Sequence, residues 1–103
     1  MITYEKARQI AQLIVEKEVP DEDCALYDEP FRETDLVWVF TYNTKDYMRT
    51  GNMLDALGGN NPIIVEKETG KTAEILTCDD IDEALSDYER KLKLKKLNDS
   101  NQI

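Results

Sequence analysis

The sequence predicts a small α+β protein with the element order α-β-β-β-β-α, in which two helices cover one face of a four-stranded antiparallel meander. Two segments with the apolar spacing of amphipathic helices follow Thr3 and Asp80, and β-branched and aromatic runs lie between them. Short links join the successive strands, which favours antiparallel pairing. With 103 residues and 41% hydrophobic composition, the chain fits one core. We therefore expect one domain over residues 1–97 and a polar, frayed tail over 98–103.

The first helix has a clear start and a clear end. Thr3 is a favourable N-cap, and Val19 precedes Pro20 and so disfavours helical backbone. Between them, one apolar stripe has helical spacing: Ala7, Ile10, Ala11 and Ile14. Leu13 is expected to widen that stripe.

The strands are expected in the middle of the chain. A short first strand is predicted over Cys24–Tyr27. A polar turn that contains Pro30 is predicted over Asp28–Asp35. Leu36–Tyr42 is the strongest strand signal, and it is apolar on both faces, as in an interior strand with Trp38 buried.

The segment after this strand has weaker signals. Because a long structureless loop is uncommon in a small domain, we expect the strand to continue to about Met48 past a bulge at residues 43–46. A helical turn over Asn52–Leu57 would then cover a sheet edge with Met53, Leu54 and Leu57.

A hairpin and a helix complete the prediction. Pro62–Lys67 and Lys71–Thr77 predict two strands joined by a tight turn in which Gly70 supplies a positive φ. Asp79 or Asp80 caps the last helix. Its buried stripe comprises Ile81, Ala84, Leu85, Tyr88 and Leu92.

Charge is unevenly distributed along this acidic chain, whose 22 Asp and Glu outnumber 13 Lys and Arg for a net charge of −9. Residues 16–35 hold nine acids and two bases, residues 79–89 six acids and no base, and residues 90–96 five bases and no acid. The basic cluster complements a helix C-terminus, and nucleic-acid binding is not expected. The acids fit a basic protein partner, or they serve solubility alone.

Several kinds of chemistry are excluded. Without histidine there is no Ser-His-Asp triad, Cys-His pair or imidazole ligand. Cys24 and Cys78 form no CxxC motif and are expected to be reduced. Gly70-Lys71-Thr72 lacks the first Walker glycine, since Val65 stands there, and the acids of residues 79–83 lack the glycine and distal glutamate of a calcium loop. We expect no enzyme activity, cofactor or metal.

Targeting signals are not evident either. The longest apolar run, Leu36–Phe40, is too short to span a membrane, and the N-terminus lacks the basic and apolar regions of a secretion signal. A cytoplasmic location without membrane contact is expected.

A set of short motifs resembles a known family. The motifs are Val37-Trp38-Val39-Phe40, Tyr47 to Asn52, Leu57 to Val65, Lys67-Glu68-Thr69-Gly70 and Asp87-Tyr88-Glu89. The most specific is Gly59-Asn60-x-Pro62 leading into an apolar strand and a Lys-x-x-Gly turn. Together they resemble the YrhB-like family, also called the immunity protein 35 family, over nearly the whole chain.

This resemblance implies a small α+β protein of bacterial polymorphic toxin systems that binds and blocks one cognate toxin domain. It implies scaffold roles for Trp38, Gly59, Asn60, Pro62 and Gly70, so these residues do not mark the toxin surface. One branch of the family is described as small, heat-stable and chaperone-like.

Our hypothesis is a non-enzymatic inhibitor that occludes the toxin's active site with an acidic surface. A basic nuclease cleft is one target that such a surface fits, because carboxylates can mimic phosphates. The expected contact residues combine acids with aromatic anchors: Asp21, Glu22, Asp23, Tyr27, Asp28, Glu29 and Phe31. The alternative is a chaperone-like holdase, and the oligomeric state stays open.

Overall fold

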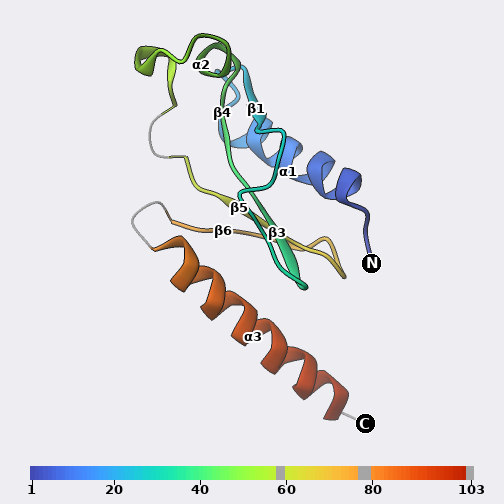
Figure 1. The fold of residues 1–103 in the computed structure, drawn as a ribbon. Coiled ribbons are helices and arrows are strands. Elements are labelled where there is room, and N and C mark those ends of the chain that lie inside the picture. The colour runs from blue at the N-terminus through green and yellow to red at the C-terminus, as the bar shows by residue number, and fades with distance from the viewer. Residues whose placement is uncertain (58–59, 77–79, 102–103) are drawn as a thin grey trace.

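The computed structural model describes residues 1–57, 60–76 and 80–101, and it confirms the predicted fold class (Figure 1). Antiparallel strands lie between an N-terminal and a C-terminal helix. The elements are α1 (Tyr4–Glu18), β1 (Cys24–Leu26), β2 (Arg32–Glu33), β3 (Val37–Phe40), β4 (Tyr42–Thr44), α2 (Lys45–Thr50), the 3-10 helix η1 (Met53–Asp55), β5 (Ile63–Glu66), β6 (Thr72–Glu74) and α3 (Ile81–Asn101).

The main sheet is a four-stranded antiparallel meander in the order β2-β3-β5-β6, so β3 is an interior strand as predicted. The assignment of its first strand was wrong. Residues 24–26 instead pair with β4 in a separate two-stranded sheet, and the edge of the meander is β2, inside the predicted polar turn. An edge strand needs only backbone pairing, so the exposed polar side chains of Arg32 and Glu33 gave no strand signal.

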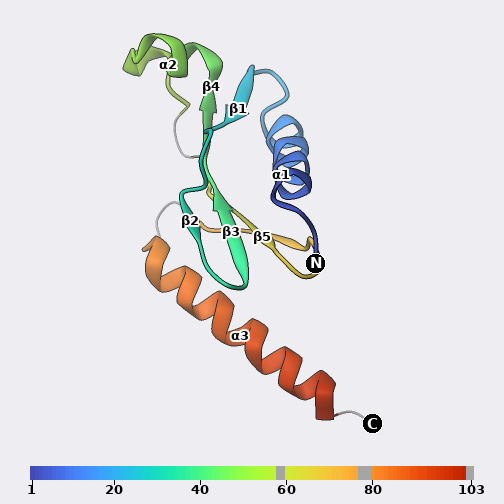
Figure 2. The same ribbon diagram turned by 45° about the vertical axis from the view of Figure 1, so that its right-hand side comes forward.

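The prediction that both helices lie on one face was also wrong. α1 packs on Trp38, Phe40, Ile63 and Val65, whereas α3 packs on Val37, Val39 and Ile64. Successive residues of a strand point to opposite faces, so the two helices cover opposite sides of the sheet (Figures 1 and 2). The physical reason is that β3 and β5 are apolar on both faces, and each face needs a cover.

α1 begins and ends where the sequence predicted. The Thr3 hydroxyl accepts a hydrogen bond from the Lys6 backbone N–H, and Val19 is the C-cap. The buried line is Ala7, Ala11 and Val15, and Ile14 packs beside it. Leu13 is 65% exposed, which corrects the expectation that it widens the stripe, because two residues beyond Ala11 it lies on the other side of the helix.

The segment after β4 differs most from the prediction. Backbone pairing stops at Thr44, whose hydroxyl accepts from the Tyr47 N–H and starts α2 instead of a longer strand. Gly51, at φ 70°, closes this short helix. The expected helical turn is η1. Of the three residues expected to cover a sheet edge, Leu57 packs against the core, whereas Met53 is 73% and Leu54 92% exposed.

The hairpin and the last helix follow the prediction. Gly70 has φ 78° in the turn between β5 and β6, where its N–H donates to the Glu66 carbonyl at 2.9 Å. The Asp80 carboxylate accepts from the Glu83 N–H at 3.1 Å, and the expected stripe of α3 packs on the sheet. Asp79 lies outside the described residues. The helix continues to Asn101, and the domain limit at residue 97 stays a prediction.

Candidate partner-binding surface

A bulge in a long hairpin shapes the predicted contact segment. β1 pairs with β4 from Cys24 to Leu26, and β2 pairs with β3 from Arg32 onward. Between the pairs Leu26–Tyr42 and Arg32–Val39, the first strand has five residues and the second has two. Three residues, Asp28, Glu29 and Pro30, are therefore extra and bulge out of the ladder.

Helix α1 holds this bulge through its main chain. The Arg8 guanidinium donates to the carbonyls of Tyr27 at 2.8 Å and Asp28 at 3.2 Å, and the Tyr4 hydroxyl donates to the Asp28 carbonyl at 3.4 Å. Backbone bonds from Tyr27 N–H to Thr41 at 3.0 Å and from Phe31 N–H to Val39 at 2.8 Å close both ends. The fold thus fixes the bulge backbone and leaves its side chains to solvent.

Both predicted aromatic anchors, Tyr27 and Phe31, directly flank the bulge and are exposed like its acids. Tyr27, Asp28, Glu29 and Phe31 are all exposed. The Arg32 guanidinium lies 4.4 Å from the centre of the Phe31 ring and makes a 3.2 Å ion pair with Asp82 of α3. Phe31 therefore presents only part of its ring, and α3 helps to hold it.

The other predicted contact residues lie in the turn before β1. Asp21, Glu22 and Asp23 are exposed. The Asp23 carboxylate makes a 3.0 Å ion pair with Lys45, and the Asp23 backbone carbonyl accepts from the Lys45 N–H at 2.8 Å. Burial, together with the charges of Glu22 and Asp23, raises the pKa of the free thiol of Cys24. Only the three residues of β1, about 10 Å of strand, separate this turn from the bulge. The seven predicted contact residues, in the turn and the bulge, are called the bulge surface below.

The free edge of β1 is closed by α1. The Gln12 amide donates to the Cys24 carbonyl at 3.1 Å, and its oxygen accepts from the Leu26 N–H at 3.2 Å. This pairing keeps the strand between the two acidic groups in place and leaves its outer edge unavailable to another strand.

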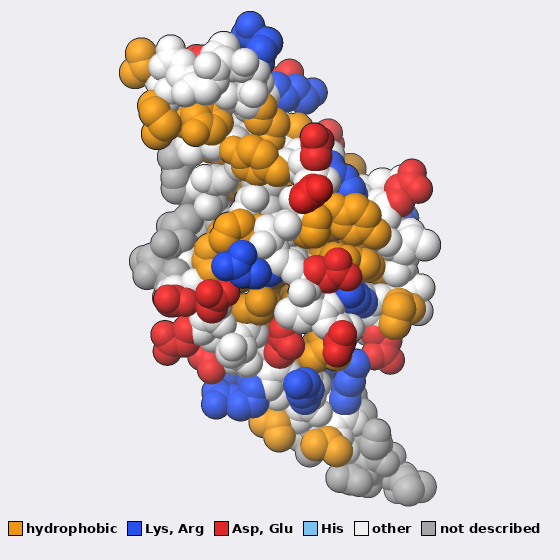
Figure 3. Space-filling view, in the orientation of Figure 1, with side chains coloured by type: hydrophobic (Ala, Val, Ile, Leu, Met, Phe, Trp, Pro, Cys, Tyr) orange, Lys and Arg blue, Asp and Glu red, His pale blue; other side chains and the backbone are white. Residues whose placement is uncertain are grey.

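The sequence analysis missed an apolar tip next to the acidic turn. Met48, Met53 and Leu54 of α2 and η1 are exposed, and hydrophobic side chains gather over these elements in Figure 3. The Thr44 hydroxyl donates to the Asp55 carbonyl at 2.6 Å and so orders the tip. Leu54 of the tip and Glu22 of the acidic turn line the same pocket. Thr44 and Gly51, as helix caps, were the available sequence signals.

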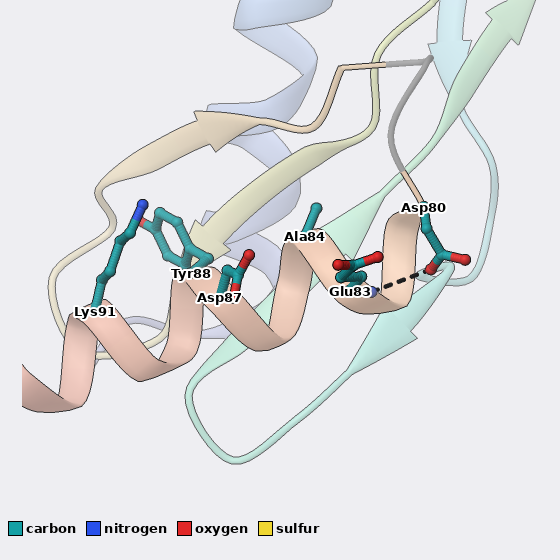
Figure 4. Close-up of a pocket in the computed structure, with 6 residues that line it drawn as sticks. All are labelled: Asp80, Glu83, Ala84, Asp87, Tyr88 and Lys91. Atoms are coloured by element: carbon teal, nitrogen blue, oxygen red, sulfur yellow. Dashed lines mark hydrogen bonds between the residues drawn. The ribbon is translucent and has the colours of Figure 1, made fainter.

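A hollow lies beside α3, and polar groups of its lining are tied into the fold by hydrogen bonds. Its lining, drawn in Figure 4, is Asp80, Glu83, Ala84, Asp87, Tyr88 and Lys91. The Tyr88 hydroxyl donates to the buried Glu66 carboxylate, and burial with that partner raises the pKa of Tyr88. Glu66 also accepts from the Thr69 hydroxyl at 2.9 Å, so this buried charge is hydrogen-bonded within the fold.

Three of the motif residues are buried or hydrogen-bonded within the fold. Trp38 is 7% exposed, which confirms its predicted burial, and its ring contacts Tyr4. Asn60 donates to the Tyr42 carbonyl, and Pro62 is buried at the entrance to β5. Gly59 and Cys78 lie outside the described residues.

Neither a metal-binding cluster nor a membrane-spanning helix occurs in the part of the chain that the structure describes. Within residues 1–57, 60–76 and 80–101, no group of three or more His, Cys, Asp and Glu side chains could hold a metal ion. Among the same residues, no helix has the length and apolar character that a membrane span requires.

Comparison with known proteins identifies the family. The profile of the immunity protein 35 family matches residues 5–90, and the chain belongs to this family. It is 33% identical over 54 residues to "Uncharacterized protein YrhB" of Escherichia coli K12, a match over 52% of this chain and 57% of that protein. The match thus spans little more than half of YrhB. No solved structure matches the chain. The family description, immunity protein, is the coarse indication of role that this comparison gives.

Proposed function

We propose that this protein neutralises a cognate toxin domain in the bacterial cytoplasm by covering the toxin's active site with the bulge surface. Family membership supports the general role. The observation that carries the choice of surface is the bulge itself, whose main chain is held by Arg8 and Tyr4 while its side chains stay exposed. A surface ordered before binding loses little conformational entropy on association.

The chemistry of the bulge surface favours a basic cleft as its target. Five carboxylates are grouped around β1, and two aromatic side chains stand among them. Carboxylates at this density can replace the phosphates of a nucleic acid in a nuclease cleft, and partly buried aromatic side chains are typical binding hot spots. A basic nuclease-type toxin is therefore the proposed partner.

The test neutralises the acids without changing their shape. The test variant carries Asp21→Asn, Glu22→Gln, Asp23→Asn, Asp28→Asn and Glu29→Gln. The control variant carries Asn or Gln in the same way at five exposed acids outside the bulge surface and α3: Glu5, Glu16, Glu18, Asp35 and Glu74. Each variant loses five charges from a net charge of −9, so long-range attraction is matched.

We expect the test variant to associate with the co-purified toxin domain about tenfold more slowly than the control, and to lose most of its salt dependence. Stopped-flow or biosensor kinetics at low and high salt measure both quantities. Phe31→Ala and Tyr27→Ala should instead raise the dissociation rate, because these side chains desolvate at the contact. Equal rates for the test and control variants would show that the toxin binds elsewhere.

A holdase role is the second candidate, and the apolar tip favours it. Exposed Met48, Met53 and Leu54 could bind unfolded chains through apolar contact. The variant Met53→Gln with Leu54→Gln should then lose the ability to suppress aggregation of unrelated heated proteins and should still protect against the toxin. If no single tight partner co-purifies and the parent protein suppresses the aggregation of unrelated heated proteins, the holdase role replaces the immunity role.

A further inference from the structure

Helix α3 is divided into two halves of opposite charge. Asp82, Glu83, Asp87 and Glu89 occupy its first half, and the five bases between Arg90 and Lys96 its second. Figure 3 shows acidic side chains over the start of α3, then a row of basic ones, then hydrophobic side chains towards its end. Four of these charges are also used within the chain, in ion pairs of Arg90 with Asp87 at 3.0 Å, of Asp82 with Arg32 at 3.2 Å and of Lys96 with Glu68.

A second line of residues runs along α3 on the side away from the sheet. The core line, which includes Leu85 and Leu92, packs on the sheet. The outer line consists of exposed residues spaced by four and three, as in the seam of a coiled coil: Glu83, Asp87, Arg90, Leu94 and Leu97. Leu94 is 54% exposed and Leu97 59%, so the apolar end of this seam is uncovered.

A groove runs beside the outer line. It has a volume of about 610 Å³ and lies between α3 and the turn that follows β2. Leu85, Leu94 and Leu97 give it apolar walls. Its polar walls hold three bases, two acids and two hydroxyl groups: Arg32, Arg90, Lys93, Asp82, Glu89, Thr34 and Ser86. Its lining therefore fits an apolar side chain such as leucine, carried by a helix with charged neighbours.

We infer that α3 is a self-association surface that pairs antiparallel with α3 of a second copy of this chain. A two-fold axis between Asp87 and Arg90 places the acidic half of each helix against the basic half of the other, with Asp87 of each copy opposite Arg90 of the second copy, so the same attraction occurs twice. The antiparallel helix dipoles add to it. Leu94 and Leu97 of each copy then reach the groove on the other copy. A parallel pair would instead place like charges together.

The contact is small, which sets the expected affinity. An α-helix of 21 residues is about 31 Å long, and one helix face buries less than a standard protein interface. Because the buried area is this small, we expect a dissociation constant of the dimer in the micromolar range. The net charge of −9 opposes association only weakly at physiological salt, because charges more than about 8 Å apart are screened there.

The first test removes the apolar end of the seam. Sedimentation equilibrium of the full chain from about 5 to 500 µM should show a monomer–dimer transition with a dissociation constant of order 10 µM. Leu94→Ser with Leu97→Ser should raise that constant at least tenfold. Leu76→Ser is the matched control, because Leu76 is 57% exposed and lies outside α3. Circular dichroism checks that both variants are folded.

The second test exchanges the charges. One variant carries Glu83→Lys and Asp87→Lys, so that the seam is basic, and the other carries Arg90→Glu and Lys93→Glu, so that it is acidic. Each alone should be monomeric, and an equimolar mixture should form a heterodimer. The inference is overturned if the parent stays monomeric at about 500 µM, if the leucine variant dimerises like the parent, or if the mixture fails to associate.

Discussion

Truncation of Trp38 tests the packing of the face that α1 covers. The side chain is 7% exposed, its ring centre lies 5.6 Å from that of Tyr4, and the Lys67 ammonium lies 4.9 Å from the ring centre. A buried side chain of this size removes on the order of 200 Å² from water, worth about 5 kcal/mol at 25 cal/mol per Å². Alanine keeps a small part of that area, and the cavity adds a cost, so Trp38→Ala should destabilise the fold by about 4 kcal/mol.

The assay follows from the sequence. Trp38 is the single tryptophan, so the variant loses its fluorescence signal and must be followed by far-UV circular dichroism. For a domain of this size, about 4 kcal/mol lowers Tm by roughly 15–30 °C. Leu13→Ala is the control, because Leu13 is 65% exposed, and its Tm should change little. A Trp38→Ala protein that melts within a degree or two of the parent would refute the assignment of this face.

Three further predictions concern the turn, the buried acid and a carboxylate pair. Gly70→Val should cost roughly 1–2 kcal/mol in urea unfolding, with or without phosphate, because φ is 78° and a Cβ would lie 3.4 Å from the side chain of Ile10. Tyr88→Phe should cost about 1–3 kcal/mol by the same assay, because buried Glu66 loses a donor. A hydrogen bond with Glu74 and its charge raise the pKa of Glu18, so the folded state gains relative stability at low pH and loses it as pH rises through that pKa. Glu74→Gln should therefore raise Tm at pH 7 and raise it less at about pH 4; equal gains at both pH values would contradict the pairing.

Much of the local structure was determined by the sequence. Thr3, Asp80 and Gly70 act through hydrogen bonds or φ angles that involve residues a few positions away, so their roles could be predicted and are confirmed. The strand containing Trp38 could also be predicted locally. Its β-branched and aromatic side chains favour extended backbone whichever strand it pairs with.

The bulge surface could be predicted only in part. Its charge and its aromatic residues are visible in the sequence, and the seven residues are exposed in the structure, while their role as a contact surface stays a prediction. Its shape depends on the register between two strands and on the reach of Arg8 from α1, both long-range contacts. The apolar tip was missed because Met53 and Leu54 are apolar, and burial is the usual fate of such side chains.

The sequence by itself determined where α1 and α3 begin, which strand is interior and which catalytic groups are lacking, since these depend on residue type and close neighbours. Only the tertiary structure decided that α1 and α3 cover opposite faces. The two-sided apolar pattern of Val37–Phe40 required two covers, but nothing local assigns a helix to a face. That choice depends on the path of the chain through β1, β4 and α2, where main-chain pairing and caps, not hydrophobic pattern, set the geometry.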